Sequence, residues 1–393
     1  MDLRESAEDR AFRSEVREWL EANLTGDFAT ARGLGGPGRE HEALEIRQAW
    51  EKHLGEAGWT CIGWPKEYGG RDLSLQQQVI FHEEYARADA PIRVGLIGEG
   101  MVGPTLLAFG TDDQRERFLP PIRRGEQMWC QFYSEPNAGS DLANVSTRAE
   151  RDGEDYVING QKVWSSLAAW ADWGFAIVRT EAGSKRHKGL SYLLVPVHQD
   201  GIELRPIVQA TGTSEFSEVF FDNARTSAAN LVGAEGDGWK VGMATLGFER
   251  GTFTLGQQVG FQRELERVID IAHKVGASED PEIRQRLSRA WTGVSIMRWN
   301  ALRTLGGPAS GSPGATGSIG KLFWSTWHQE LGQLAMDVLG MAGMVVEKPY
   351  ELTPEQVTFL FSRADTIYAG SSEVQRNIIA ERTLGLPREP PSA

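Results

Sequence analysis

The first third of the chain shows the apolar spacing of one-sided helices. In the stretches 1–24 and 73–90, apolar residues recur at steps of three and four, which places them on one face of a helix. A Gly- and Pro-containing connection, "GWPKEYGG" at 63–70, lies between them. We therefore predict a helical domain over residues 1–125. The periodic positions are Val16, Trp19, Leu20, Leu24, Val79, Ile80 and Tyr85.

The pattern changes after residue 125 to short runs rich in β-branched and aromatic residues. Gly, Asn and Asp punctuate these runs, as they do between strands. Asn159-Gly160 predicts a tight hairpin turn. Residues 126–235 are therefore expected to form an antiparallel β domain. The predicted strands lie at 154–166, 173–182, 190–197, 202–207 and 217–224.

Helical patterns return from residue 236 to the end of the chain. Residues 238–275 contain no proline over about 37 positions, enough for a single helix of about 55 Å. Two more long helices are predicted at 281–306 and 321–343. The Gly/Ser/Pro-rich stretch 306–320 between them is expected to be a loop. It lacks the Lys-Ser/Thr pair of a phosphate-binding loop, because Lys321 is followed by leucine.

Composition narrows the classes of function. A formal charge of −13 over 393 residues disfavours a nucleic-acid partner. The apolar runs are shorter than the roughly 18 residues of a membrane span, and the charged N-terminus does not resemble a signal peptide. Cys61 and Cys130 are the only cysteines, which fits a reducing cytoplasm, and the histidines show no metal-ligand spacing. We expect a cytoplasmic protein without a metal site.

Several motifs together resemble the acyl-CoA dehydrogenase family along the whole chain and in the family's order. "CQFYSEPNAGSD" at 130–141 resembles its first flavin loop, and "GQKVWSS" at 160–166 resembles its second. "SEVFFDNARTSAANLVGAEGDGWKV" at 217–241 resembles the end of its β domain. "DTIYAGSSEVQRNIIAERTLG" at 365–385 resembles its C-terminal segment. "GWPKEYGG" and "RFLPPIRRGE" fit the N-terminal domain.

The resemblance implies an α+β fold with three parts and an FAD cofactor. These parts are an N-terminal helical domain (1–125), a middle antiparallel β-barrel-like domain (126–235) and a C-terminal four-helix bundle (236–393). Trp164 would offer a flat apolar face to the flavin ring, while serine hydroxyls and backbone N–H groups would reach its polar edge. Ser140 could bond a phosphate or a pantetheine oxygen. The residues implied in FAD binding are Tyr133, Ser134, Gly139, Ser140, Trp164, Ser165, Ser166, Ser371 and Glu373.

The implied reaction is α,β-dehydrogenation of an acyl-CoA thioester, in which a carboxylate removes the α-proton. Most relatives carry that carboxylate directly after the tyrosine of the C-terminal motif, where this chain has Ala369. Ala369 can still donate its backbone N–H to the thioester oxygen. A minority of relatives, including isovaleryl- and long-chain acyl-CoA dehydrogenases, place the base on the long helix before an arginine, here Glu249-Arg250. We expect Glu249 to be the base, with Glu373 as its rival.

Substrate contacts are implied for Ser140, Arg250 and Gly370, and electron-transferring flavoprotein is the implied electron acceptor. The basic stretch "SKRHKG" at 184–189 is either a solvated loop or a contact for the CoA phosphates. The acyl group itself is left open.

The chain departs from the family at its implied subunit contacts. The Arg-x-x-Phe-Gly motif that reaches a neighbouring subunit's FAD is missing, and Asp337 stands where relatives carry glutamine. Three hypotheses therefore remain: a homo-oligomeric (dimeric or tetrameric) dehydrogenase, one subunit of a heterotetrameric dehydrogenase of the steroid side-chain type, and a flavin-binding relative without this activity.

Overall fold

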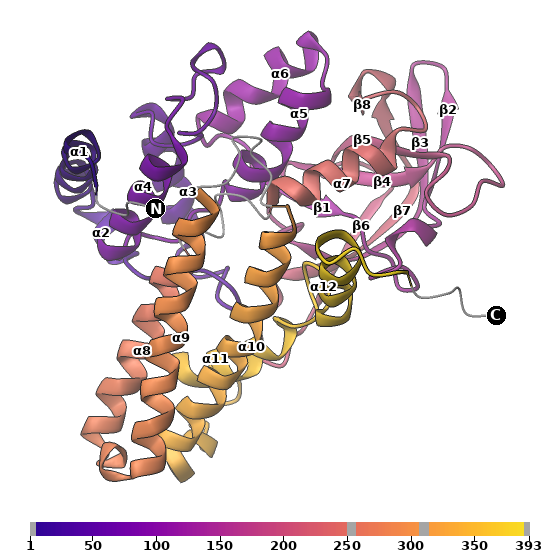
Figure 1. Cartoon of the computed structure of the whole chain (residues 1–393). Helices are drawn as coiled ribbons and strands as arrows, with labels where there is room; N and C mark the ends of the chain where they lie inside the picture. Colours follow the sequence, from indigo (N-terminus) through magenta and orange to yellow (C-terminus); the bar gives the residue numbers. More distant parts are fainter. Residues whose placement is uncertain (1–4, 250–256, 306–313, 389–393) are drawn as a thin grey trace.

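The computed structural model describes residues 5–249, 257–305 and 314–388. Within these ranges it describes every side chain except those of residues 249, 302–305 and 314–316. Figure 1 shows three regions in chain order: N-terminal helices, a sheet and a second group of helices. The predicted α+β class with helical ends and a β middle is confirmed.

Helices form the N-terminal region, and all the predicted periodic positions except Trp19 are buried. Val16 and Leu20 of α1 are buried with Val79 and Ile80 of α4, whereas Trp19 is partly buried beside this core. Hydroxyl side chains cap α1 and α4 at Ser6 and Ser74, in both cases as capping boxes. The helices are α1 (Ala7–Asn23), α2 (Asp27–Thr30), α3 (Leu44–Glu56), η1 (Lys66–Tyr68), α4 (Leu75–Arg87), η2 (Gly98–Val102), α5 (Gly103–Phe109) and α6 (Asp112–Arg123).

The middle region is an eight-stranded sheet with the order β6-β7-β3-β2-β4-β5-β8, and β1 pairs with β4 off this path. The five predicted strands are confirmed, and β1, β2 and β8 are additional. Pairing is antiparallel except where β4 runs parallel to β1 and meets β2 at one parallel position. The strands are β1 (Trp129–Phe132), β2 (Arg148–Asp152), β3 (Asp155–Ser166), β4 (Trp173–Arg179), β5 (Leu190–Pro196), β6 (Ile202–Ile207), β7 (Phe216–Ser227) and β8 (Leu231–Val232).

The hairpin predicted at Asn159-Gly160 is wrong, because both residues lie inside β3. The pairing of β3 with β7 shifts its register between Ile158 and Gly160, so the strand bulges there instead of turning. At Gly160, φ is +148° and a Cβ atom would lie 2.6 Å from the Thr147 hydroxyl oxygen. Glycine therefore serves a bulge and a close approach of two chain segments.

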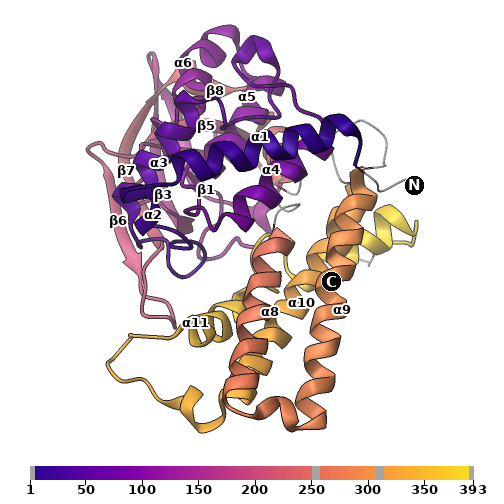
Figure 2. The same cartoon turned by 90° about the vertical axis from the view of Figure 1, so that its left-hand side faces the viewer.

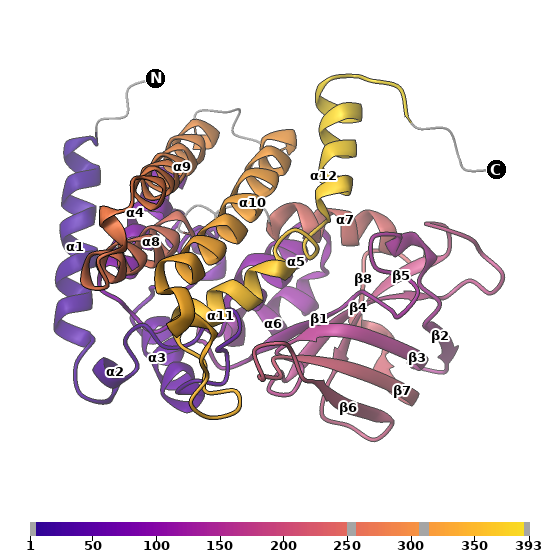
Figure 3. The ribbon, with the colours of Figure 1, turned by 90° about the horizontal axis from the view of Figure 1, so that it is seen from below.

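The C-terminal helices differ from the prediction in two places. The stretch expected as one long helix contains two, α7 (Gly238–Glu249) and α8 (Gln257–Lys274), with undescribed residues 250–256 between them. Figures 1 and 3 show α7 beside the sheet and α8 within the bundle. The expected loop at 306–320 is helical in its second half, since α10 begins at Gly314, and residues 306–313 lie outside the described ranges. The remaining C-terminal elements are α9 (Pro281–Leu305), α10 (Gly314–Leu339), η7 (Gly340–Met344), α11 (Pro354–Phe361), η8 (Ser362–Ala364), α12 (Ser372–Ile378) and η9 (Ile379–Thr383).

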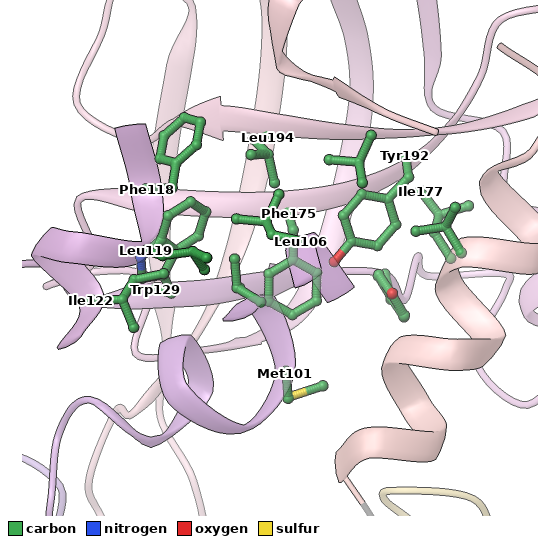
Figure 4. Close-up of a cluster of buried hydrophobic side chains, with 14 of the residues drawn as sticks. Met101, Leu106, Phe118, Leu119, Ile122, Trp129, Phe175, Ile177, Tyr192 and Leu194 are labelled. Carbon is green, nitrogen blue, oxygen red and sulfur yellow. The ribbon is translucent and has the colours of Figure 1, made fainter. Parts of the chain in front are cut away.

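One hydrophobic cluster joins the N-terminal helices to the sheet and to α7. Figure 4 shows Leu106 of α5 near Phe175 of the sheet, and Phe118 of α6 meets Trp129 and Trp173 of the sheet edge-on. Helix α7 approaches the sheet closely, since a Cβ atom on Gly242 would lie 2.4 Å from Ile177. The bundle α8–α11 extends away from this assembly, as Figure 2 shows, and has its own core of leucine, valine and aromatic side chains.

Candidate active site

The two stretches predicted to contact the flavin lie against each other. The first follows β1, and the second forms the end of β3. The Val163 N–H donates to the Ser134 carbonyl at 2.9 Å, and the Lys162 ammonium donates to the Tyr133 carbonyl at 3.0 Å. The structure thus brings the predicted residues Tyr133 and Ser134 next to the segment that carries Trp164.

A buried ion pair that the sequence did not reveal fixes this contact. Lys162 is fully buried and lies 2.9 Å from Glu135. Glu135 also accepts hydrogen bonds from the backbone N–H groups of Ser146 and Thr147. Burial alone would raise the pKa of Glu135, but the ammonium and these donors lower it to about 2. Burial lowers the pKa of Lys162 to about 8, so the pair remains charged at neutral pH.

Trp164 lies at an irregular point of β3 with its ring exposed. Its φ is +59°, and the pairing of β3 with β7 shifts register between Lys162 and Ser165. The indole side chain is 57% exposed and meets Phe216 in an edge-on contact at 6.1 Å. A planar apolar ligand would cover this ring, as burial of apolar area is favourable. The position therefore fits the isoalloxazine ring of FAD.

Small polar residues follow Trp164 in the sequence and also occur in the first flavin loop. Ser165 is buried, and its hydroxyl has no hydrogen-bond partner among the described residues. Ser134 and Ser166 are partly exposed, whereas Ser140 is exposed. A Cβ atom on Gly139 would meet open space, which leaves room for a ligand beside the backbone. This donor set suits the polar edge of a flavin and a phosphate chain.

The segment before α12 holds Ala369 in an unusual backbone conformation. Ala369 has φ +51° and Gly370 has φ +89°. The buried Gln375 side chain donates to both of their carbonyls, at 3.0 and 3.3 Å. The Ser371 hydroxyl caps α12 by accepting from the Val374 N–H. None of the described residues accepts a hydrogen bond from the Ala369 N–H.

Glu373, the rival base, is exposed at the start of α12. It lies 3.6 Å from Arg376. Hydrogen bonds from its own backbone N–H and from the Ser371 hydroxyl lower the pKa of its carboxyl. Such a carboxylate is a poorer general base than one whose pKa is raised toward neutrality.

Glu249 is the last residue of α7, and its side chain lies outside the described residues, as does the whole of Arg250. Their roles stay predictions. The described neighbours in α7 anchor the helix on the sheet: Val241 and Thr245 are buried, and Gly242 lies against Ile177.

The predicted site residues thus form two groups, one on the β region and one at the start of α12. Bonds from Lys162 and Val163 join the two stretches of the first group, and bonds from Gln375 hold Ala369 and Gly370 in the second. None of the described hydrogen bonds joins one group to the other. The two described surface hollows lie elsewhere, one along α1–α3 and one beside Arg13 and Trp299. No metal-binding cluster and no helix capable of crossing a membrane occur in the described parts of the chain.

Three family models match the chain. They are the acyl-CoA dehydrogenase N-terminal domain at residues 6–126, the middle domain at 130–224 and the C-terminal domain at 236–384. Among similar sequences, acyl-CoA dehydrogenase IpdE1 of Mycobacterium tuberculosis is 60% identical over 96% of this chain and 98% of its own length. IpdE1 of Mycolicibacterium smegmatis is 58% identical over 97% of this chain and 99% of its own.

Solved structures of the same fold cover nearly the whole chain. The Tcur3481-Tcur3483 steroid ACAD aligns with a TM-score of 0.85 and 31% identity, over 99% of this chain and all of that one. The ChsE4-ChsE5 complex from Mycobacterium tuberculosis aligns with a TM-score of 0.83 and 31% identity, with the same coverage. On these matches the chain belongs to the acyl-CoA dehydrogenase family of FAD-dependent oxidoreductases.

Proposed function

We propose that this enzyme oxidises an acyl-CoA thioester to the trans-2-enoyl-CoA, with Glu249 as the base and the Ala369 N–H as a hydrogen-bond donor to the thioester oxygen. The observation that carries the proposal is the backbone of Ala369. A left-handed conformation costs a residue other than glycine about 1 to 2 kcal/mol and persists only where the surroundings enforce it. Here the Gln375 side chain donates hydrogen bonds to the carbonyls of Ala369 and Gly370.

This N–H would supply the electrostatic part of catalysis. Removal of an α-proton places negative charge on the thioester oxygen, and a fixed donor near that oxygen stabilises the transition state. A side chain is not needed for this, so alanine can serve where relatives carry glutamate. The proton acceptor must then come from another element.

The position of Glu249 on α7 supports its assignment as the proton acceptor. Position 249 follows Val241 and Thr245 at steps of four, the spacing of neighbours on one helical face. Both of these residues are buried, with Val241 in the core shared with the sheet. Arg250 and Gly370 would contact the substrate, together with Ser140.

FAD would be held by Tyr133, Ser134, Gly139, Ser140 and the Trp164–Ser166 stretch, with Ser371 and Glu373 at the start of α12. Bound FAD supplies the hydride acceptor for the substrate's β-carbon. We further propose that electrons pass to electron-transferring flavoprotein and that the enzyme works in the cytoplasm.

Anaerobic addition of acyl-CoA thioesters to the purified, FAD-loaded protein tests the activity. Substrates that differ in length and branching should bleach the flavin absorbance to different extents, and the product should be the trans-2-enoyl thioester. A fully loaded protein that no thioester bleaches would contradict the proposal.

A second proposal, that the chain is one subunit of a heterotetramer, is favoured by Asp337. This acid replaces a glutamine that reaches across subunits in relatives. It lies 2.7 Å from Arg286 of α9 and accepts from Gln333 at 3.1 Å, so its charge is paired within the chain. The two-protein composition of the Tcur3481-Tcur3483 and ChsE4-ChsE5 structures adds support. The native mass of the enzyme from its own source distinguishes a complex of two chains from a homo-oligomer.

A further inference from the structure

A buried cluster of charged side chains lies directly before the Ala369 segment. His328 of α10 is held between two carboxylates: its Nδ1 lies 2.5 Å from Asp365 and its Nε2 lies 2.7 Å from Glu264 of α8. His328 and Asp365 are buried. The cluster links three segments that are distant in sequence.

Asp365 connects His328 to the segment that contains Ala369. Its second carboxylate oxygen accepts from the Tyr368 hydroxyl at 2.9 Å, one residue before Ala369. The Asp365 carbonyl accepts from the ammonium of Lys321, which also lies 5.0 Å from the centre of the Tyr368 ring. Both ends of the short turn containing Tyr368 are therefore held from α10.

Further bonds fix the same turn from its other side. Gln329 of α10 donates to the Thr366 hydroxyl at 3.0 Å, and the Ser372 N–H donates to the Thr366 carbonyl at 3.0 Å. Gln375 holds the carbonyls of Ala369 and Gly370. The strained conformation of Ala369 is thus enforced by α10 and α12 together.

We propose that His328 is a positioning residue: through Asp365 and the Tyr368 hydroxyl it fixes the backbone of Ala369 so that its N–H is held in place for the thioester oxygen. The link to the thioester rests on the proposed function, whereas the fixing of the segment does not. The two parts can therefore be tested separately.

Hydrogen–deuterium exchange of the FAD-loaded protein tests the fixing of the segment. Replacing His328 with Gln removes the charge that joins the two carboxylates, so the hydrogen-bonded amides of Ile367, Tyr368 and Ser372 should exchange about 10- to 100-fold faster, as expected where a local opening becomes easier. Tyr368→Phe removes only the hydroxyl bond, keeps the ring, and should accelerate the same amides. His53→Gln, at a histidine of α3 that bonds Asn23, is the matched control and should leave them unchanged.

Kinetics of anaerobic flavin reduction tests the second part. His328→Gln should lower the limiting reduction rate about 10- to 100-fold with little change in the substrate concentration at half-saturation, because misplacement of a catalytic group affects the transition state more than binding. His328→Lys, which keeps a cation, should restore part of the rate. Unchanged exchange of the Ile367, Tyr368 and Ser372 amides in both His328→Gln and Tyr368→Phe would overturn the proposal. Faster exchange with an unaltered reduction rate would leave the restraint standing but remove Ala369 from catalysis.

Discussion

At the scale of single residues, the central question is which carboxylate removes the proton. The methyl side chain of Ala369 cannot accept a proton, and Glu373 is exposed and its carboxyl has a lowered pKa. Glu249→Gln keeps size and polarity but removes the acceptor, so the flavin reduction rate should fall by about 10² to 10⁴ while substrate still binds. Stopped-flow absorbance under anaerobic conditions measures this. Glu266→Gln, at an exposed glutamate of α8, is the control.

Adding Ala369→Glu to the Glu249→Gln enzyme should restore part of the rate, because it places a carboxylate at the position that most relatives use. A Glu249→Gln enzyme with undiminished reduction would transfer the role to another acid, and Glu373→Gln would then be the next variant to measure.

The exposed indole ring gives a second prediction at this scale. Replacing Trp164 and Ser166 together with alanine removes the apolar face and a hydroxyl donor, so less FAD should remain bound after purification. The ratio of flavin absorbance to protein absorbance measures occupancy. Trp291→Ala is a matched control, since that side chain is 60% exposed on α9. A double variant that retains full occupancy would show that the flavin lies elsewhere.

At the scale of elements, the hydrophobic pattern predicted those helices and strands whose apolar residues recur at regular spacing. The five strands found were rich in apolar and β-branched residues, whereas β2, "RAERD", has a single buried position and offers no such signal. Asn159-Gly160 carries the same two residues that form tight turns, and only the close approach of Thr147 shows that a bulge is required. Local sequence does not contain that neighbour.

The same limit applies to the candidate site. The motifs indicated the residues of the flavin loops, but the pairs that hold these loops connect distant positions. Lys162 and Glu135 are 27 residues apart, and His328 is 37 residues from Asp365 and 64 from Glu264. Charged residues in an amphipathic pattern usually face water, so their burial becomes evident only in three dimensions.

The Lys162–Glu135 pair predicts how the two flavin loops depend on each other. Lys162→Met leaves a carboxylate buried without its cation, which should destabilise the folded state by about 3 to 5 kcal/mol. Combining Lys162→Met with Glu135→Gln in one double variant should cost less, because no unpaired charge remains. Thermal unfolding followed by circular dichroism, with FAD occupancy in parallel, compares the two. Equal losses in the single and double variants would mean that the charge pairing is unimportant.

At the scale of the whole molecule, the His328 cluster ties the bundle together and makes its stability depend on pH. Burial alone would lower the pKa of His328, but the carboxylates of Glu264 and Asp365 raise it to about 10. Besides these two acids, Lys321 contacts Asp365, while Arg267 and Arg39 act on Glu264. A pKa raised on folding stabilises the folded state fully below the unfolded value near 6.5, and this contribution is lost as pH rises toward 10.

The titration of Lys162 changes the stability of the folded state in the opposite direction over this pH range. A His328 variant is therefore needed to isolate the contribution of the histidine. The pKa of Lys162 is lowered to about 8, which makes the folded state relatively more stable as pH rises. The thermal midpoint of the FAD-loaded enzyme, measured from about pH 6 to about pH 10, should therefore be compared with that of His328→Gln. The variant should lose most stability at the acid end of this range and approach the parent at the alkaline end, because the parent's histidine has by then lost its proton. A constant difference across that range would mean that His328 packs in the bundle as a neutral ring, and that its charge does not hold Glu264 and Asp365 together.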